Sequence, residues 1–232
     1  LSNSWTPTAD LNTPGCCDTA TLLHDGRVLV TDEKKAEIFD PATETWTMTG
    51  ELNTARRFHK AALLNTGEVL VMGGEDARPG MEGNMLAGAE LYNPHWETWT
   101  PVGDLNTARD NHTATRLPDG RVLVTGGWTG TTHLASAEIF DPGSETFSPT
   151  ADITGGIFLD SAEEYDPQTG SWTLAGTMSD PRSDPEIVLI GSGQVLVSGG
   201  YRDEGALASA DLYTPLVTGW KATGAVVQPR EG

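Results

Sequence analysis

Histidine and arginine side chains recur together in this chain, and their spacing limits the chemistry that they could support. His59 and His112 occupy equivalent positions in two successive repeats of the sequence, with Arg57 close to the first of them. Histidines can bind a metal or transfer protons, but a zinc site usually has three or four protein ligands. No general base is paired with an orienting group. We therefore predict no metal, no other cofactor and no catalytic residue. His59 and His112 stay candidates for binding a ligand or partner, and packing against a neighbouring strand is their alternative role.

An arginine stands near the start of several repeats. A residue that recurs with the repeat favours a structural role, such as a salt bridge or a cap between neighbouring repeats, over ligand binding. Arg109 and Arg182 nevertheless lie on the face where we expect a ligand, so they stay candidates for binding together with Arg57. The recurring positions are Arg56, Arg109, Arg182 and Arg230.

Residues that break the repeat are stronger candidates for binding. Trp128 and Tyr201 directly follow a Gly-Gly pair, at the position where another repeat has Glu75. An exposed aromatic ring can stack on a sugar or anchor a protein partner; the alternative is that each ring covers its own repeat. The insert that begins at Glu75 carries Met81 and Met85, whose side chains suit an adaptable contact surface, although a disordered loop is the alternative.

The two cysteines, Cys16 and Cys17, are adjacent in the sequence. Their spacing rules out a long-range disulfide framework within the chain. They can close a strained vicinal disulfide, stay reduced, or pair outside the chain, and the sequence does not choose among these states. They fall on the same predicted face as the histidine-containing segments.

Self-similarity predicts the elements that position these residues. A segment that begins with alanine and an acidic residue and runs to an aromatic residue returns several times, and a segment with the pattern Val-Leu-Val precedes most copies. Strand-rich repeats with a period of about 40–50 residues are typical of propeller blades. The copies are Ala36–Trp46, Ala89–Trp99, Ala137–Phe147, Ala162–Trp172 and a weaker one at Ala210–Pro215.

Each full repeat predicts four antiparallel strands. The first is apolar or rich in Thr and Ala, and a tight turn such as Pro118-Asp119-Gly120 leads into a continuous apolar run typical of a strand buried on both faces. The third strand alternates, and the fourth is short and carries Trp or Phe. The loops after the second and fourth strands share one face, where a rigid scaffold would hold binding residues. Gly-Gly pairs such as Gly126-Gly127 predict a close approach of two backbones.

The Gly-Gly pair, the Tyr or Phe of the third strand and the Trp of the fourth resemble the kelch repeat over nearly the whole chain. The resemblance implies an all-β fold, a β-propeller of four-stranded antiparallel blades around a central channel. We expect one domain over residues 1–232. Its repeats lie at about 14–50, 51–103, 104–150, 151–176 and 177–224, and residues 1–9 form the closing strand of the last blade.

The expected number of blades follows from the spacing of the fourth-strand aromatic residues. Phe147 and Trp172 lie about half as far apart as Trp99 and Phe147, so the fourth repeat is shortened. We expect a six-bladed ring that this sequence contains incompletely. A natural five-bladed ring is the alternative.

Charge and hydropathy exclude several classes of partner. Lys and Arg number 14 against 33 Asp and Glu, for a net charge of -19. A surface this acidic repels phosphate, so we predict that nucleic acid and anionic membranes are not partners. No apolar run approaches the roughly 18–20 residues that cross a bilayer, so we predict no membrane insertion. The start at Leu1, with no signal segment, suggests a processed protein of extracellular or periplasmic location.

Three classes of function remain open. The first is a non-catalytic module that binds a protein or glycan across the variable loop face, which is what the kelch resemblance implies. The second is a structural subunit of a larger extracellular assembly.

The third class is an enzyme that acts on sugars. Galactose-oxidase-like copper enzymes have kelch-type propellers, but their copper site needs two tyrosines, and only Tyr201 lies outside the third-strand position. A resemblance to sialic-acid epimerases would place arginines, Glu75 and His112 around an acidic sugar. We therefore favour a role without catalysis.

Overall fold

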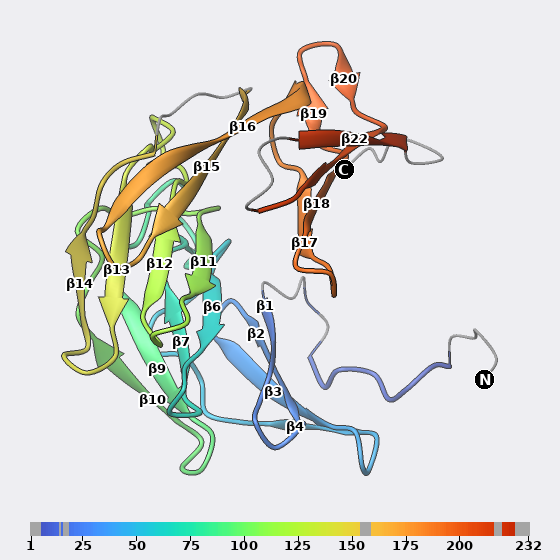
Figure 1. Cartoon of the computed structure of the whole chain (residues 1–232). Coiled ribbons are helices and arrows are strands. Elements are labelled where there is room, and N and C mark those ends of the chain that lie inside the picture. The colour runs from blue at the N-terminus through green and yellow to red at the C-terminus, as the bar shows by residue number, and fades with distance from the viewer. Residues whose placement is uncertain (1–5, 14, 16–18, 154–158, 216–219, 226–232) are drawn as a thin grey trace. The chain divides into compact units, whose positions relative to one another are not determined.

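The computed structural model describes residues 6–13, 15, 19–153, 159–215 and 220–225. Every regular element among them is a strand, so the all-β prediction is confirmed (Figure 1). No helix in this part of the chain is long and apolar enough to span a membrane. The chain divides into two compact units, which we call the N-terminal unit (Leu1–Thr150) and the C-terminal unit (Ala151–Gly232).

The N-terminal unit contains three four-stranded antiparallel sheets. The first consists of β1 (Thr19–Leu22), β2 (Val28–Asp32), β3 (Lys35–Asp40) and β4 (Thr45–Met48). The second consists of β6 (Lys60–Leu63), β7 (Val69–Met72), β9 (Ala89–Asn93) and β10 (Thr98–Val102). The third consists of β11 (Thr113–Arg116), β12 (Val122–Thr125), β13 (Ala137–Asp141) and β14 (Thr146–Pro149). The strands of each sheet follow one another in chain order, as in propeller blades.

The tight turns between first and second strands form where the sequence predicts them. Asp119 accepts a hydrogen bond from the backbone N–H of Arg121 at 3.1 Å, and Gly120 has a φ of 93°. Glycine adopts this left-handed conformation without steric cost. The turn therefore returns the chain directly into β12.

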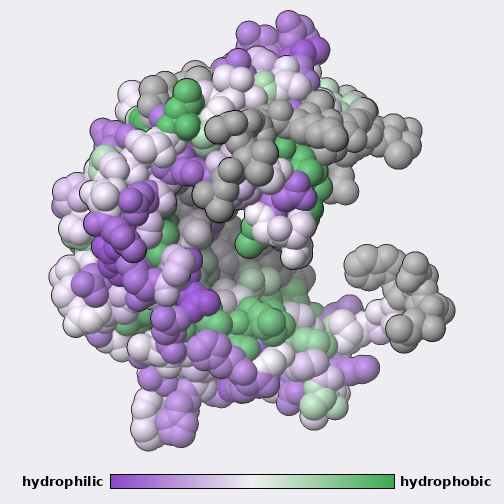
Figure 2. Space-filling model, in the orientation of Figure 1, coloured by the Kyte–Doolittle hydropathy of each residue, from purple (hydrophilic) through white to green (hydrophobic). Residues whose placement is uncertain are grey.

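Two hydrophobic clusters join the sheets of the N-terminal unit. The first lies between the first two sheets and includes Ile38, Val71 and Trp99; the second lies between the second and third sheets and includes Met72 and Phe140. The second strand of each sheet supplies much of this core, as the continuous apolar runs predict. Strand β6 contacts both β1 and β11, so the first strands of successive sheets are neighbours. The visible surface over β10, β13 and β14 is mainly hydrophilic (Figure 2).

The third and fourth strands of the sheets hold a repeated aromatic pair. The rings of Tyr92 and Trp99 lie 4.9 Å apart, and those of Phe140 and Phe147 also lie 4.9 Å apart. Tilted pairs at this distance are favourable beyond the area they bury. The recurring aromatic positions in the sequence therefore stabilise each sheet from within.

The C-terminal unit contains one four-stranded sheet and two smaller ones. The four-stranded sheet consists of β17 (Glu186–Leu189), β18 (Val195–Ser198), β21 (Ser209–Tyr213) and β22 (Trp220–Ala225). The smaller sheets pair β15 (Leu159–Asp166) with β16 (Ser171–Arg182) and β19 (Tyr201–Arg202) with β20 (Gly205–Ala206). Strands β15 and β16 correspond to the third and fourth strands of the shortened repeat, and they keep its aromatic pair, Tyr165 and Trp172, at 5.0 Å.

Candidate functional site

The arginine near the start of a repeat is buried and forms an ion pair with a residue of the third strand of that repeat. Arg109 is fully buried and lies 2.8 Å from the carboxylate of Glu138 on β13. It also donates hydrogen bonds to the carbonyl oxygens of Gly126 and Ser136, at 2.8 and 2.9 Å. The equivalent pairs are Arg56–Glu90 at 2.9 Å and Arg182–Asp211 at 2.8 Å.

These arginines hold the start of each blade against its third strand. The salt bridge expected for a repeated structural residue is present, and it joins the start of a repeat to the third strand of the same repeat. Burial lowers the pKa of Arg56, and the nearby carboxylate of Glu90 opposes this effect. Buried charges of this kind are tolerated when they are paired and hydrogen-bonded. The guanidinium groups of Arg109 and Arg182 therefore lie below the surface.

The two histidines occupy equivalent buried positions with unequal partners. The Nε2 atom of His59 lies 2.7 Å from the hydroxyl of Thr31 on β2. The position of Thr31 in the first repeat is taken by Met72 in the next one, so His112 has no equivalent hydroxyl. Neither ring nitrogen of His112 has a hydrogen-bond partner among the described residues. Burial lowers the pKa of each histidine from 6.5 to about 3, helped by the positive charges of nearby arginines. Both rings are therefore neutral over a wide pH range.

The Gly-Gly pairs allow the close backbone approach that the sequence predicts. A Cβ on Gly127 would lie 2.5 Å from the carbonyl oxygen of Asp110, and one on Gly200 would lie 2.5 Å from that of Ser183. A Cβ on Gly74 would likewise lie 2.6 Å from a backbone carbonyl oxygen. All three also have positive φ. Glycine is therefore required at this place in the second, third and last sheets.

In three repeats, the residue after the Gly-Gly pair lies opposite another residue in an antiparallel pairing. That partner is the residue directly after the buried arginine. Arg57 pairs with Glu75 in the short sheet of β5 (Arg56–Arg57) and β8 (Glu75–Asp76). Asp110 and Trp128 exchange two backbone hydrogen bonds, at 3.1 and 3.0 Å. Ser183 and Tyr201 form the equivalent pair in the C-terminal unit. Directly paired residues project their side chains to the same face, so the sequence-predicted residues Glu75 and Trp128 each have a fixed neighbour.

Phe58 is held in an unusual backbone conformation on this face. Its φ is 57°, and the equivalent Asn111 and Asp184 each have a φ of 48°. Asparagine and aspartate visit this left-handed region readily, whereas a bulky side chain there is an outlier. Phe58 is 45% exposed, and the guanidinium carbon of Arg57 lies 5.9 Å from the centre of its ring.

The two inserts that follow the Gly-Gly pairs touch each other. Glu75 accepts hydrogen bonds from the backbone of Gly83 and, at 3.2 Å, from Nε of Arg57. A Cβ on Gly130 would lie 3.3 Å from the carbonyl oxygen of Gly83 and 3.8 Å from Met85. Trp128 packs against its loop neighbour His133, with ring centres 4.6 Å apart. Met81 is 40% exposed, and Met85 is half-buried.

Asp110 is the most unusual carboxyl group of this region. The residue is 4% exposed, and its Oδ2 accepts one hydrogen bond, of 3.2 Å, from Asn111. Its Oδ1 is buried and has no hydrogen-bond partner within the described chain. Burial raises the pKa of Asp110, and the negative charge of nearby Glu75 raises it further. Such shifts cluster at functional sites.

We name the surface formed by these residues the loop cluster. It brings together sequence-predicted residues from two repeats of the N-terminal unit, whereas Tyr201 and Arg182 belong to the C-terminal unit and Cys16 and Cys17 lie outside the described residues. No group of three or more His, Cys, Asp and Glu side chains that could hold a metal ion occurs in the part of the chain that the structure describes. The members of the loop cluster are Arg57, Phe58, Glu75, Met81, Met85, Asp110, Asn111 and Trp128.

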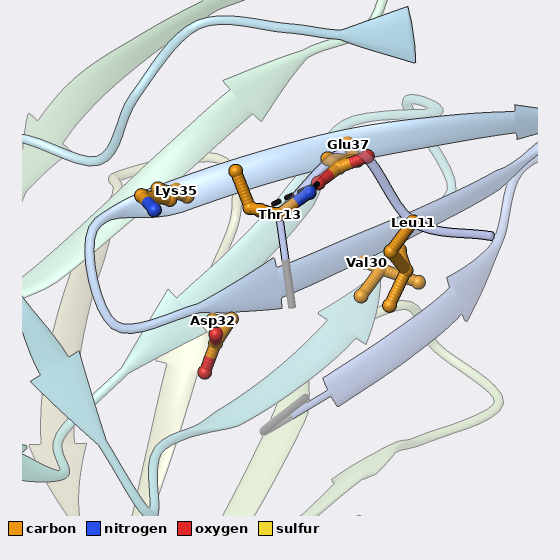
Figure 3. A pocket seen from close by; sticks show the side chains of 6 residues that line it. All are labelled: Leu11, Thr13, Val30, Asp32, Lys35 and Glu37. Atoms are coloured by element: carbon orange, nitrogen blue, oxygen red, sulfur yellow. Dashed lines mark hydrogen bonds between the residues drawn. The ribbon is translucent and has the colours of Figure 1, made fainter. Parts of the chain in front are cut away.

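The first repeat departs from the others at the position of the buried arginine. Gly15 stands there, and the carboxylate of Asp32 lies against it in the space of the missing side chain. A small cavity lies beside these residues, with Glu37 on its wall (Figure 3). The backbone and hydroxyl of Thr13 donate to Glu37 at 2.8 and 2.6 Å, and Asn12 supplies two further hydrogen bonds. Glu37 is thus satisfied without an arginine.

Three residues of interest were not singled out from the sequence as binding residues, although Phe58 and Asp110 lie on the loop face that it predicts. Phe58 stands where the other repeats have Asn111 and Asp184, and this mismatch was the signal that could have found it. Asp110 gave no signal, because its unpaired oxygen depends on the folded structure. Trp96, 71% exposed in the turn between β9 and β10, stands where other repeats have small polar residues.

Comparisons with known proteins agree with this geometry. A family model for the kelch motif matches residues 112–154. The chain is 38% identical over 56 residues to spermatocyte protein spe-26 of Caenorhabditis elegans, and 32% identical over 66 residues to galactose oxidase of Gibberella zeae. These segments cover 24% and 28% of this chain but only 10% of each relative.

Solved structures extend the likeness to the whole fold. The structure of YjhT has a TM-score of 0.72 at 14% identity, with 96% of this chain and 87% of that chain covered. A fungal alcohol oxidase of the AA5 family, in complex with copper, has a TM-score of 0.59 at 16% identity, with 92% and 54% covered. At such identity the likeness concerns the fold alone. Together, the kelch motif match, the galactose oxidase relative, the solved structures and the repeated sheets support a kelch-repeat β-propeller.

Proposed function

We propose that this chain is a non-catalytic binding module whose loop cluster contacts a protein or glycan partner. A kelch-type propeller suits a protein-binding module, and the proposal assigns that role to named loops. The observation that carries it is the conformation of Phe58. Strained residues that the surrounding structure holds in place are concentrated at functional sites.

The strain at Phe58 is not offset by burial. A left-handed conformation costs a bulky residue roughly 1–2 kcal/mol. Phe58 is 45% exposed, so packing within the chain recovers only part of that cost. An asparagine, as in the next repeat, would adopt the same backbone with less strain. An exposed aromatic residue on a strained backbone is therefore best explained as a contact residue, since aromatic residues are enriched among the anchors of binding surfaces.

Neighbouring residues support the same role. Trp128 is half-buried beside the loop cluster, and Met81 and Met85 offer side chains that adapt to different partners. Arg57 and Glu75 add charged groups that could orient a partner. The loops that carry these residues are held by the Gly-Gly pairs and by the buried arginines, which makes the scaffold rigid.

A panel of small ligands tests this proposal. The ¹⁵N-labelled protein is titrated with blocked tripeptides that have a basic, acidic, apolar or aromatic central residue, and with neutral and acidic oligosaccharides. We expect at least one class to shift the backbone signals of the loop cluster. Phe58→Asn should weaken that binding and raise stability by about 1 kcal/mol, as relief of strain predicts.

Trp96→Ala is the matched control, because it removes an exposed aromatic ring outside the loop cluster. It should leave the binding unchanged. A panel in which every ligand leaves the loop cluster unperturbed would overturn the proposed function. Turnover of an oligosaccharide would instead favour the sugar-acting enzyme, and stable association with a larger assembly through other faces would favour the structural subunit.

We further propose six blades for the complete ring, from the regular spacing of the fourth-strand aromatic residues in the full repeats. Closing a ring of blades leaves only short, protected sheet edges. An experimental structure of the protein with a closed ring of five blades would contradict this number. Fractionation of the producing cells tests the proposed extracellular or periplasmic location.

A further inference from the structure

Asp110 differs from the other buried carboxylates of the chain in its hydrogen bonds. Glu138 accepts hydrogen bonds from Asn106, Thr107 and Arg109, and Glu90 has the equivalent donors. Asp110 is similarly buried, but it receives a side-chain hydrogen bond of 3.2 Å at Oδ2 and, among the described residues, no hydrogen bond at Oδ1. A buried carboxylate oxygen without a donor is costly. Its retention needs an explanation outside the fold itself.

The charges around Asp110 leave an excess of negative charge. Glu75 is close enough for its charge to raise the pKa of Asp110. The ion pair of Glu75 is with Arg57, at 3.2 Å. One guanidinium group therefore faces two carboxyl groups within the loop cluster. Across the whole chain the net charge is -19, which attracts a cationic partner from solution.

The aromatic residues of the loop cluster suit the same kind of ligand. Asp110 and Trp128 form a directly paired position, so their side chains are neighbours on one face. Phe58 presents an exposed ring on the neighbouring loop, whose backbone accepts a hydrogen bond from Asn111. The face of an aromatic ring attracts a cation. A carboxylate beside one aromatic residue, with a second aromatic ring exposed on the neighbouring loop, is a combination that suits an ammonium or guanidinium group.

We propose that Asp110 binds the side-chain cation of a lysine or arginine carried by a protein partner, with Phe58 and Trp128 beside it. This inference rests on the proposed function and deepens it, because it names the chemistry that the loop cluster recognises. Asn111 is exposed and donates a side-chain hydrogen bond to the Asp110 carboxylate. It is the side chain that moves when the partner's cation reaches Oδ1.

The test compares three blocked tripeptides that differ in their central residue. One has arginine, one has lysine, and one has citrulline, which keeps the shape of arginine without its charge. Each is titrated into the ¹⁵N-labelled protein while the indole N–H signal of Trp128 is followed. We expect the arginine and lysine peptides to shift this signal. The citrulline peptide should bind at least about tenfold more weakly, as expected when a buried charge loses its partner.

Two substitutions connect this binding to the carboxylate. Asp110→Asn keeps the size of the side chain and removes its charge. It should therefore weaken binding of the arginine peptide about tenfold and leave binding of the citrulline peptide unchanged. Glu75→Gln should weaken binding less, because it removes only the neighbouring charge. Asp203→Asn is the charge-matched control: Asp203 is exposed in the C-terminal unit, and its substitution should leave binding unchanged.

The outcomes separate this inference from the proposed function. Equal binding of arginine and citrulline peptides, or full binding by Asp110→Asn, would overturn the role of Asp110. Oligosaccharides that bind the loop cluster while the basic peptides do not would leave the proposed function intact and refute a cationic ligand. If no ligand perturbs the loop cluster, both proposals fail. Should Asp110→Asn lose its folded spectrum, Glu75→Gln and the citrulline comparison still decide the question.

Discussion

The two buried histidines should make the stability of the protein depend on pH. His59 and His112 are buried and have pKa values lowered from 6.5 to about 3. The perturbation that isolates this effect is His112→Leu, which removes one titrating ring at a position where neither ring nitrogen has a hydrogen-bond partner among the described residues. Leucine has a similar volume, so the substitution should be tolerated near neutral pH.

The direction of the effect follows from the neutral form. Burial and the positive charges of Arg109 and Lys60 lower the pKa of His112, so the folded protein binds no proton there until the pH approaches 3. The unfolded chain binds one below about pH 6.5. Stability is therefore fully present above pH 6.5 and is lost as the pH falls from there toward about 3.

The magnitude follows from the same two values. A pH of about 5 is roughly 1.5 units below the pKa of a histidine in the unfolded chain, and each unit corresponds to about 1.4 kcal/mol of free energy. Each histidine should therefore reduce the free energy of unfolding by about 2 kcal/mol between about pH 7 and pH 5. The two together should reduce it by about 4 kcal/mol, a large part of the stability of a typical domain.

Urea denaturation followed by tryptophan fluorescence measures this difference. Wild type and His112→Leu share the same carboxylates, so the difference between their pH profiles isolates the imidazole. The variant should lose about 2 kcal/mol less than wild type between about pH 7 and pH 5. His24→Leu, at an exposed position, is the control and should follow the wild-type profile. A stability difference between His112→Leu and wild type that does not change with pH would refute the reasoning.

Three further substitutions test the repeated structure by the same denaturation assay. Arg109→Met should lower the free energy of unfolding by about 3–5 kcal/mol, because it leaves a buried carboxylate unpaired. The same change at Arg121, in a half-exposed ion pair, should lower it by at most about 1 kcal/mol. Equal losses at the two positions would contradict the structural role of burial. Met72→Thr should lower stability, because the loss of a fully buried methionine side chain, about 2–5 kcal/mol for a core truncation, exceeds the about 1 kcal/mol that a hydrogen bond to His112 returns, and a gain in stability would show that the hydrogen bond dominates. Gly127→Ala should cost more than about 2 kcal/mol, because its Cβ would meet a carbonyl oxygen and its φ is positive; a neutral effect would mean that the backbone shifts freely.

Several features of the fold could be predicted from the sequence because they depend on neighbouring residues. The tight turn at Asp119 and Gly120 requires only a short side chain that bonds the next backbone N–H and a glycine with positive φ. The apolar run at β12 predicts a buried strand whatever lies against it. The Gly-Gly pairs predict a close approach, although the partner, the backbone that follows the buried arginine, could be identified only in the structure.

The candidate site was predicted less completely. The sequence pointed to the loop face and to Glu75 and Trp128, because those residues interrupt a regular pattern. It did not distinguish Arg109, which is buried in an ion pair, from Arg57, whose side chain is 35% exposed. The pattern of a repeat shows that two residues are equivalent, but exposure depends on which strand or loop covers each of them.

The sequence by itself therefore determined the strands, their turns and their repetition, since these follow from local alternation, glycine conformation and self-similarity. Only the tertiary structure decided which polar atoms found partners. Thr31 meets His59 across two sheets, whereas His112 meets no such hydroxyl and the Oδ1 atom of Asp110 finds no donor among the described residues. Hydrogen bonds between distant segments depend on how successive sheets pack. A single difference between repeats, such as Met72 in place of a threonine, removes such a hydrogen bond without changing the repeat pattern that specifies the fold.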